Sequence, residues 1–300
     1  MASVVLISIL VFFYMPSVIM ANFKMEGMYP PVFTPFNDKG VIDPSVLDDY
    51  AKYISEGGAK GIYVADTTGE GPNLCEPEKK LLFRCWVPIA KKYNLRVVAQ
   101  IGGGSQSEMI NLAKYCCNLG VDAITVQPTV YFKPKSIEEV TQLLEAVSKA
   151  APSTPIQYID YPKFTNVELN MPALFSLATK KIPNFVGMTV DVGTAVRISA
   201  VNTLKPYQTL CIRDHALTSS AVFLGYGCFT SIVINVYPLA VSQVIKHAAD
   251  GNITMAKESQ LALNSIAVRI SKEGFLLSGY KAAMEIYAGI KVGNPRIPLQ

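Results

Sequence analysis

Carboxylate and hydroxyl side chains follow two apolar segments of the sequence, residues 61–65 and 182–188. The set consists of Asp66, Thr67, Thr68, Thr189 and Asp191. Thr189 and Asp191 are two residues apart, so on a strand their side chains can face the same interior. Carboxylates in a partly dehydrated pocket favour cations such as an amine or an iminium. These residue types therefore favour a small molecule that carries an amine or an imine.

Apolar segments alternate along the chain with segments that predict helices. The expected strands cover residues 28–33, 61–65, 96–101, 121–126, 155–159, 182–191, 208–212 and 229–235. Eight strands that alternate with helices in one domain-sized length are typical of a (β/α)8 TIM barrel, an α/β fold. The pattern alone leaves a doubly wound sheet open. In a barrel, the site lies where the strands end on the carboxyl-terminal face, and the polar residues above follow strands in this way.

Length and charge restrict the class of protein. Three hundred residues, half of them hydrophobic, suit one large α/β domain. The formal net charge of +4 comes without a dense basic run, so nucleic-acid binding is not suggested. We expect residues 22–235 to form the barrel and residues 236–300 to add a C-terminal helical extension to the same domain.

The N-terminal segment 4–21 is almost wholly apolar and stands apart from the rest of the chain. It ends in the small residue Ala21, which fits a secretory signal peptide over residues 1–21. The alternative is an uncleaved membrane anchor, which Pro16 and the short apolar core disfavour. The expected location is therefore the secretory pathway: the endoplasmic reticulum lumen, the vacuole or the extracellular space.

The six cysteines show no spacing that predicts a metal site, and the sequence contains only two histidines. An oxidising compartment would permit disulfides. The simpler interpretation is that the cysteines are small buried hydrophobic residues. We expect neither a metal nor a cofactor.

Several separated motifs of the chain resemble those of the dihydrodipicolinate synthase / N-acetylneuraminate lyase family of aldolases. Residues 34–43 read TPFNDKGVID, residues 66–70 read DTTGE, residues 182–188 read IPNFVGM and residues 291–299 read KVGNPRIPL. The resemblance covers about residues 28–299. It implies a TIM barrel with three C-terminal helices, a small-molecule substrate, and a homo-oligomer, either a tetramer or a dimer.

The chain departs from this family at the positions that matter most for its chemistry. Thr189 stands where the resemblance implies the lysine that forms a Schiff base with pyruvate, and a hydroxyl cannot form an iminium with a ketone. Ile159 stands where it implies the proton-transferring tyrosine, and Phe164 where the synthase branch has an arginine for a second carboxylate. A dicarboxylate ligand is therefore not expected. Asp66 replaces a glycine.

Other family positions are retained. Thr67 and Thr68 keep the hydroxyls of the carboxylate-binding motif, and Tyr131 matches an aromatic residue that often belongs to a proton relay across a subunit interface. Ser231 and Asn235 match polar residues of the eighth strand. Lys281 matches a lysine that is usually structural, so we do not expect it to act as a nucleophile.

Two hypotheses follow. The first is a repurposed enzyme that makes or breaks a C–C bond without a Schiff base, with Asp191 or Asp66 as the base or the partner of a cation. Tyr131, Thr67, Thr68 and Thr189 would position or protonate an enolate, while Ile159, Phe164, Ser231 and Asn235 would line the substrate site. The second is a secreted inactive pseudoenzyme or small-molecule-binding barrel. For Asp66 and Asp191, the competing interpretation is a solvated or helix-capping acid.

Overall fold

The computed structural model describes residues 23–272 and 276–300. The predicted signal peptide over residues 1–21 lies outside this part of the chain, so it stays a prediction. No helix among the described residues is both long enough and apolar enough to span a bilayer.

Eight parallel strands alternate with helices, which confirms the predicted (β/α)8 TIM barrel with additional C-terminal helices. The strands are β1 (Gly27–Met28), β2 (Gly61–Val64), β3 (Arg96–Gln100), β4 (Ala123–Val126), β5 (Ile156–Ile159), β6 (Phe185–Val190), β7 (Thr209–Ile212) and β8 (Cys228–Phe229). Their order in the sheet is β1-β8-β7-β6-β5-β4-β3-β2. For description, the chain divides into two compact units, one with residues 101–210 and one with residues 26–100 and 211–300.

The unit with residues 101–210 contains β4, β5 and β6. Its helices are α4 (Gln106–Leu119), α5 (Ile137–Ala150), α6 (Pro162–Thr165), α7 (Met171–Lys181) and α8 (Val192–Val201). Strands β5 and β6 pair in parallel, with Ile159 directly opposite Thr189. Gly187 has a φ of 140°, and a Cβ added there would lie 1.9 Å from the carbonyl oxygen of Thr209. Only glycine lets the β6 backbone pass so close to its neighbour.

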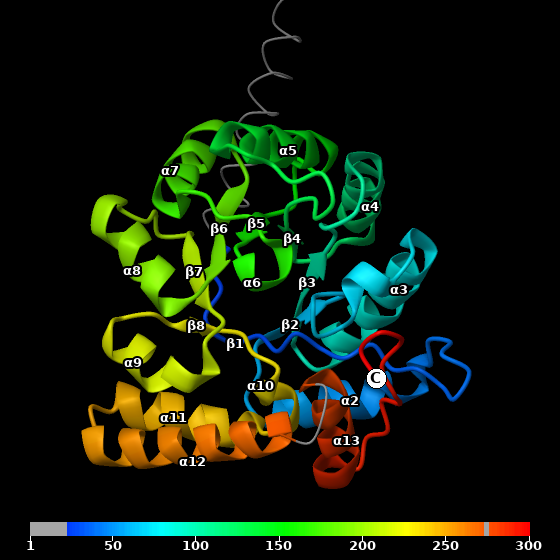
Figure 1. Ribbon diagram of the computed structural model, residues 1–300, viewed down its shortest axis with the longest axis vertical. Coiled ribbons are helices and arrows are strands. Elements are labelled where there is room, and N and C mark those ends of the chain that lie inside the picture. The colour runs from blue at the N-terminus through cyan, green and yellow to red at the C-terminus, as the bar shows by residue number, and fades with distance from the viewer. Residues whose placement is uncertain (1–22, 273–275) are drawn as a thin grey trace, which may run out of the picture. The chain divides into compact units, whose positions relative to one another are not determined.

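The other unit holds the first three strands, β8 and the C-terminal helices. Its helical segments are η1 (Pro44–Val46), α2 (Leu47–Glu56), η2 (Gly71–Asn73), α3 (Glu76–Lys92), η3 (His215–Leu217), α9 (Thr218–Phe223), α10 (Val233–Val236), α11 (Pro238–Ala249), α12 (Ile253–Lys272) and α13 (Leu276–Ala288). The first strand pairs with β8, and Met28 also bridges to Ala59 just before β2. Helices α11 and α12 lie side by side (Figure 1).

The eighth strand is shorter than the sequence predicts. A strand was expected over 229–235, but β8 ends at Phe229 and residues 233–236 form helix α10. The expectation relied on the β-branched side chains of this segment, which favour a strand only when a pleated neighbour is available. Here tertiary packing buries all four residues of α10 in a helical turn instead.

All six cysteines, each in the described part of the chain, are free thiols. Cys116, Cys211 and Cys228 are buried, as the simpler interpretation expects. Cys75 is exposed at the start of α3, so that interpretation is wrong for this residue.

Candidate functional site

The loop after β2 is a tight turn that presents two hydroxyls. Ala65 and Glu70 have φ angles of 60° and 59°, in the left-handed region that few non-glycine residues adopt. The amide of Glu70 donates to the carbonyl of Thr67 at 3.1 Å, which closes the turn. Thr67 and Thr68, in this turn, are half-buried. A backbone strained on both sides of a polar cluster is often found at functional sites.

Asp66 is the most unusual acid in this turn. Its Oδ1 atom is buried and has no hydrogen-bond partner among the described residues, although the amide of Thr67 donates to the carboxyl group. Burial raises the pKa of Asp66 to about 6, against smaller lowering effects of the Thr67 amide and of Arg213. An acid with a pKa near neutrality can take up and release a proton under physiological conditions.

Glu70, at the end of the same turn, has a structural role. Its carboxylate is fully buried and accepts from Lys281 Nζ at 2.7 Å and from the amide of Arg296 at 2.8 Å. Lys281 Nζ also donates to the carbonyl of Thr34 at 2.9 Å. Burial lowers the pKa of Lys281, and the adjacent Glu70 opposes that shift. The lysine is therefore committed to an ion pair, in agreement with the structural role expected for it.

The ends of β7 and β8 carry polar residues that the sequence analysis missed. Arg213 follows β7 and influences the charge of Asp66, while Thr230 follows β8 and is only 5% exposed. The hydroxyl of Thr230 has no hydrogen-bond partner among the described residues. The rule that selected Asp66, polar residues directly after a strand, also fits Arg213, which follows the strand predicted over 208–212. Thr230 could not be found in this way, because the predicted strand ran over 229–235 whereas β8 ends at Phe229.

Asn235 is fully buried and occupied by protein contacts. Its Nδ2 donates to the carbonyls of Pro31 and Ile232, and its Oδ1 accepts from the hydroxyl of Tyr50 at 2.7 Å. These contacts lock the residue into the packing of α10 and α2. Ser231 is half-buried one residue beyond Thr230.

Thr189 and Ile159 are the two positions where the family resemblance implies a lysine and a tyrosine. They are directly paired on β6 and β5, and both are buried. The neighbouring Tyr158 is also buried, and this burial, together with Asp160, raises its pKa well above that of a free phenol. A neutral phenol in that setting remains protonated at any physiological pH.

Asp191 caps the N-terminus of α8. Its Oδ1 accepts from the amide of Thr194 at 2.7 Å, and its Oδ2 accepts from the Thr194 hydroxyl at 3.2 Å. Arg197 in turn donates to the hydroxyl of Thr194 at 2.8 Å. This is the helix-capping alternative that the sequence left open, and the residue stays half-buried at the end of β6. Its role in substrate binding remains a prediction.

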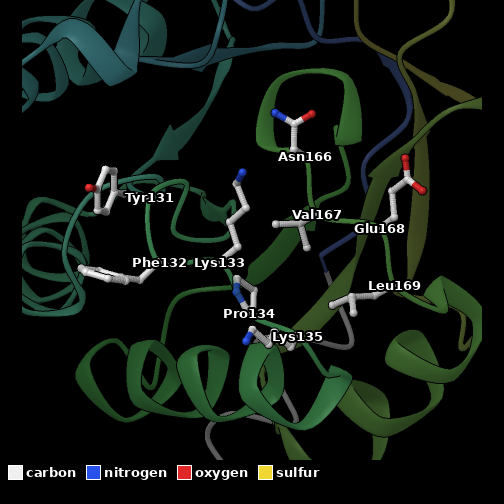
Figure 2. A pocket seen from close by; sticks show the side chains of 9 residues that line it. All are labelled: Tyr131, Phe132, Lys133, Pro134, Lys135, Asn166, Val167, Glu168 and Leu169. Carbon is white, nitrogen blue, oxygen red and sulfur yellow. The ribbon is translucent and has the colours of Figure 1, made fainter.

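Tyr131 lies on the surface, next to a cavity of about 770 Å³. The lining residues are Tyr131, Phe132, Lys133, Pro134, Lys135, Asn166, Val167, Glu168 and Leu169. Tyr131 and Phe132 lie at one side of the cavity and Glu168 at the other (Figure 2). The two rings contact each other edge to face, and they are 87% and 86% exposed. Phe164, 54% exposed, packs on the ring of Tyr161 and is not among the lining residues.

Comparisons with known proteins agree with this fold. The model of the dihydrodipicolinate synthetase family matches residues 24–300. Human N-acetylneuraminate lyase is 29% identical over 284 residues, which cover 92% of this chain and 88% of that protein. The structure of N-acetylneuraminate lyase from Aliivibrio salmonicida superposes with a TM-score of 0.86 at 24% identity, over 92% of this chain and 91% of that one. DHDPS from Cyanidioschyzon merolae with lysine bound gives a TM-score of 0.84 at 26% identity and covers 93% of each chain.

Proposed function

The chain belongs to the dihydrodipicolinate synthetase family, and from this premise we propose that it is an aldolase-type enzyme that works without a Schiff base. It would form or cleave a C–C bond between a carbonyl compound, reacting as its enolate, and an amine or cyclic imine, as in specialised metabolism. The observation that carries the proposal is Asp66: a half-buried acid whose Oδ1 is buried without a partner among the described residues, with a pKa raised to about 6, next to two hydroxyls in the sequence.

The strands of the barrel supply no amine, which supports the non-covalent route. None of the eight strands in the described chain contains a lysine, and position 189 on β6 is a threonine. Lys281 is buried and engaged by Glu70. A Schiff base requires an amine that reaches the carbonyl carbon, so a site built from the strand ends would use proton transfer and charge stabilisation instead.

Asp66 can act as both the general base and the general acid of this reaction. Its carboxylate takes a proton from the carbon next to the carbonyl group, and the electrons of that C–H bond form the enolate. The enolate carbon then bonds to the imine carbon, whose double-bond electrons move to nitrogen. The carboxyl group of Asp66 returns the proton to that nitrogen, so atoms and charge balance without a cofactor. Thr67 and Thr68 would orient the carbonyl oxygen.

General acid–base catalysis contributes only about 10²- to 10⁴-fold, so the proposal requires an electrophile that is already reactive. An iminium or a cyclic imine meets this requirement, and a carboxylate favours such a cation.

The first test asks whether the protein captures pyruvate. After incubation with pyruvate and borohydride, the intact mass should stay unchanged, because no imine is present to be reduced. A stable adduct would overturn the non-covalent mechanism.

The second test compares small molecules in host cells that express the wild-type protein, Asp66→Asn or Asp49→Asn. Asp49 is an exposed acid on α2 and provides the matched control. We expect products of C–C bond formation in the wild type and the control but not in Asp66→Asn. Equal profiles with and without Asp66 would contradict the role given to it.

A binding barrel without turnover is the second candidate. This candidate is favoured by the helix-capping contacts of Asp191 and by the hydrogen bonds within the protein that engage both polar atoms of the Asn235 side chain. In that case, the wild-type profile would match that of cells without the protein, while a small molecule would still co-purify with it.

We also propose that the protein is a homo-oligomer, a tetramer or a dimer. Tyr131 and Phe132 form an exposed aromatic pair, and Val130 beside them is 38% exposed. Large exposed aromatic side chains are enriched at subunit interfaces. A second copy of the chain would cover this patch.

A further inference from the structure

The ladder between β7 and β8 places Arg213 beside Thr230. The two strands pair Cys211 with Cys228 and Ile212 with Phe229. The amide of Thr230 donates to the carbonyl of Ile212 at 2.8 Å, so the ladder continues beyond the strand ends. The next pair in this register is Arg213 with Thr230, so the two residues lie side by side.

Side chains alternate along a strand, so Arg213 and Thr230 face the same side as Cys211 and Cys228. The two thiols are hydrogen-bonded to each other, which shows that they share a face. Arg213 also acts electrostatically on Asp66, at the end of β2. Arg213 and Thr230 therefore lie together at two neighbouring strand ends, and Arg213 is close enough to Asp66 to act on its charge.

Thr230 Oγ1 and Asp66 Oδ1 have no hydrogen-bond partner among the described residues. Thr230 is 5% exposed, so its hydroxyl is not satisfied by open solvent. A buried polar atom without a partner is destabilising, and such atoms are retained where a ligand or an ordered water completes the bonding.

The proposed reaction creates a negatively charged enolate oxygen, which a cation and a hydroxyl such as Arg213 and Thr230 can stabilise. A Schiff base would give a neutral enamine after loss of the proton. Without it, the same step leaves a full negative charge on the enolate oxygen. That charge needs a cation and a hydrogen-bond donor near the base, at a site where water is restricted.

We infer that Arg213 and Thr230 form an oxyanion site that holds the enolate oxygen while Asp66 carries the proton. The inference rests on the proposed function and adds two catalytic residues to it. When the C–H bond breaks, its electron pair forms the C=C bond and the carbonyl π electrons move onto the oxygen. The guanidinium of Arg213 balances the resulting charge, and the Thr230 hydroxyl donates a hydrogen bond to the same oxygen. Arg213 adds a cation to a site for which the sequence predicted only carboxylates and hydroxyls.

The test isolates this step by following exchange of the methyl protons of pyruvate in D₂O by proton NMR. The wild-type protein should accelerate the exchange, and Arg213→Gln should slow it by about 10²- to 10³-fold, the usual cost of losing one oxyanion donor. Arg213→Lys keeps the charge and should retain part of the rate. Arg269→Gln, an exposed arginine on α12, is the matched control and should exchange like the wild type.

Thr230 provides variants that keep the test decisive if Arg213→Gln does not fold, as judged by circular dichroism. Thr230→Val should slow exchange by tenfold or more, and Thr230→Ser should keep the wild-type rate. Undiminished exchange in a folded Arg213→Gln or in Thr230→Val would overturn the oxyanion site, as would a wild type that does not accelerate exchange.

The failure of the proposed function would look different. Exchange that depends on Arg213, together with unchanged metabolite profiles, would keep the enolate site and remove the C–C bond-forming reaction. If the metabolite profiles change but exchange does not depend on Arg213, the C–C bond-forming reaction would stand and the oxyanion site would be removed.

Discussion

At the scale of single residues, Asp66 combines a functional property with an energetic cost. Its pKa is raised by burial to about 6, above the ordinary value of 3.8. The folded state therefore binds a proton that the unfolded state releases between about pH 4 and pH 6. Stability falls as pH rises through that window, and the loss is complete above pH 6.

Asp66→Asn should for this reason stabilise the protein at pH 8 by up to about 3 kcal/mol, from about 2 pKa units at 1.36 kcal/mol each. At pH 4 and below, where the wild-type carboxyl is neutral in the fold, the gain should disappear. Denaturant unfolding at both pH values measures this difference, and Asp49→Asn should show none. A gain that is the same at pH 4 and pH 8 would exclude the titration of Asp66 as its cause.

Asp191 offers a second prediction at this scale. Because its carboxylate caps α8, Asp191→Ala should lower the free energy of unfolding by about 1 kcal/mol, and Asp191→Asn should cost much less, since asparagine caps equally well. Chemical denaturation of the wild type, Asp191→Ala and Asp191→Asn measures these differences in the free energy of unfolding. Equal stability of wild type and Asp191→Ala would mean that the cap contributes little to folding.

At the scale of elements, an ion pair ties helix α13 and the C-terminal segment to the loop after β2. Lys281 and the Arg296 amide together satisfy Glu70, and Arg296 also forms a bidentate pair with Glu78 on α3. This pair lowers the pKa of Glu78 to about 2. Lys281 and Arg296 thus hold the turn that carries Asp66, Thr67 and Thr68, although they lie more than two hundred positions later in the sequence.

Removing one member of the buried pair should be strongly destabilising. Lys281→Met leaves the Glu70 carboxylate buried without its cation and should cost about 3–5 kcal/mol. The double variant Lys281→Met with Glu70→Gln should recover part of that loss. Thermal or denaturant unfolding compares them with Lys257→Met, an exposed lysine on α12 whose replacement should be nearly neutral. A Lys281→Met protein as stable as this control would refute the anchoring role.

At the scale of the whole molecule, the exposed aromatic pair predicts self-association. Replacing Tyr131 and Phe132 together by glutamate should shift the protein to smaller species in sedimentation velocity, because like charges would then face each other across the interface. Val201→Glu removes another exposed apolar side chain, 72% exposed on α8, and should leave the distribution unchanged. A wild-type protein that sediments as a monomer would end the oligomer proposal.

The sequence by itself determined the fold class. Eight apolar segments with helices between them, and motifs placed as in a known family, predicted the barrel. Asp66, Thr67 and Thr68 could be found because polar residues that directly follow buried strands gather at one end of a parallel sheet.

Only the tertiary structure decided how each polar group is used. No local pattern shows that Glu70 is neutralised by Lys281, that Asn235 is engaged by Tyr50 and Pro31, or that Arg213 acts on Asp66, because these partners are distant in sequence. The β-branched residues 233–236 became helical for a similar reason: packing outweighed local propensity. Burial and charge pairing are long-range quantities, so the sequence can propose the groups of a site, but only the folded chain sets their charge and their partners.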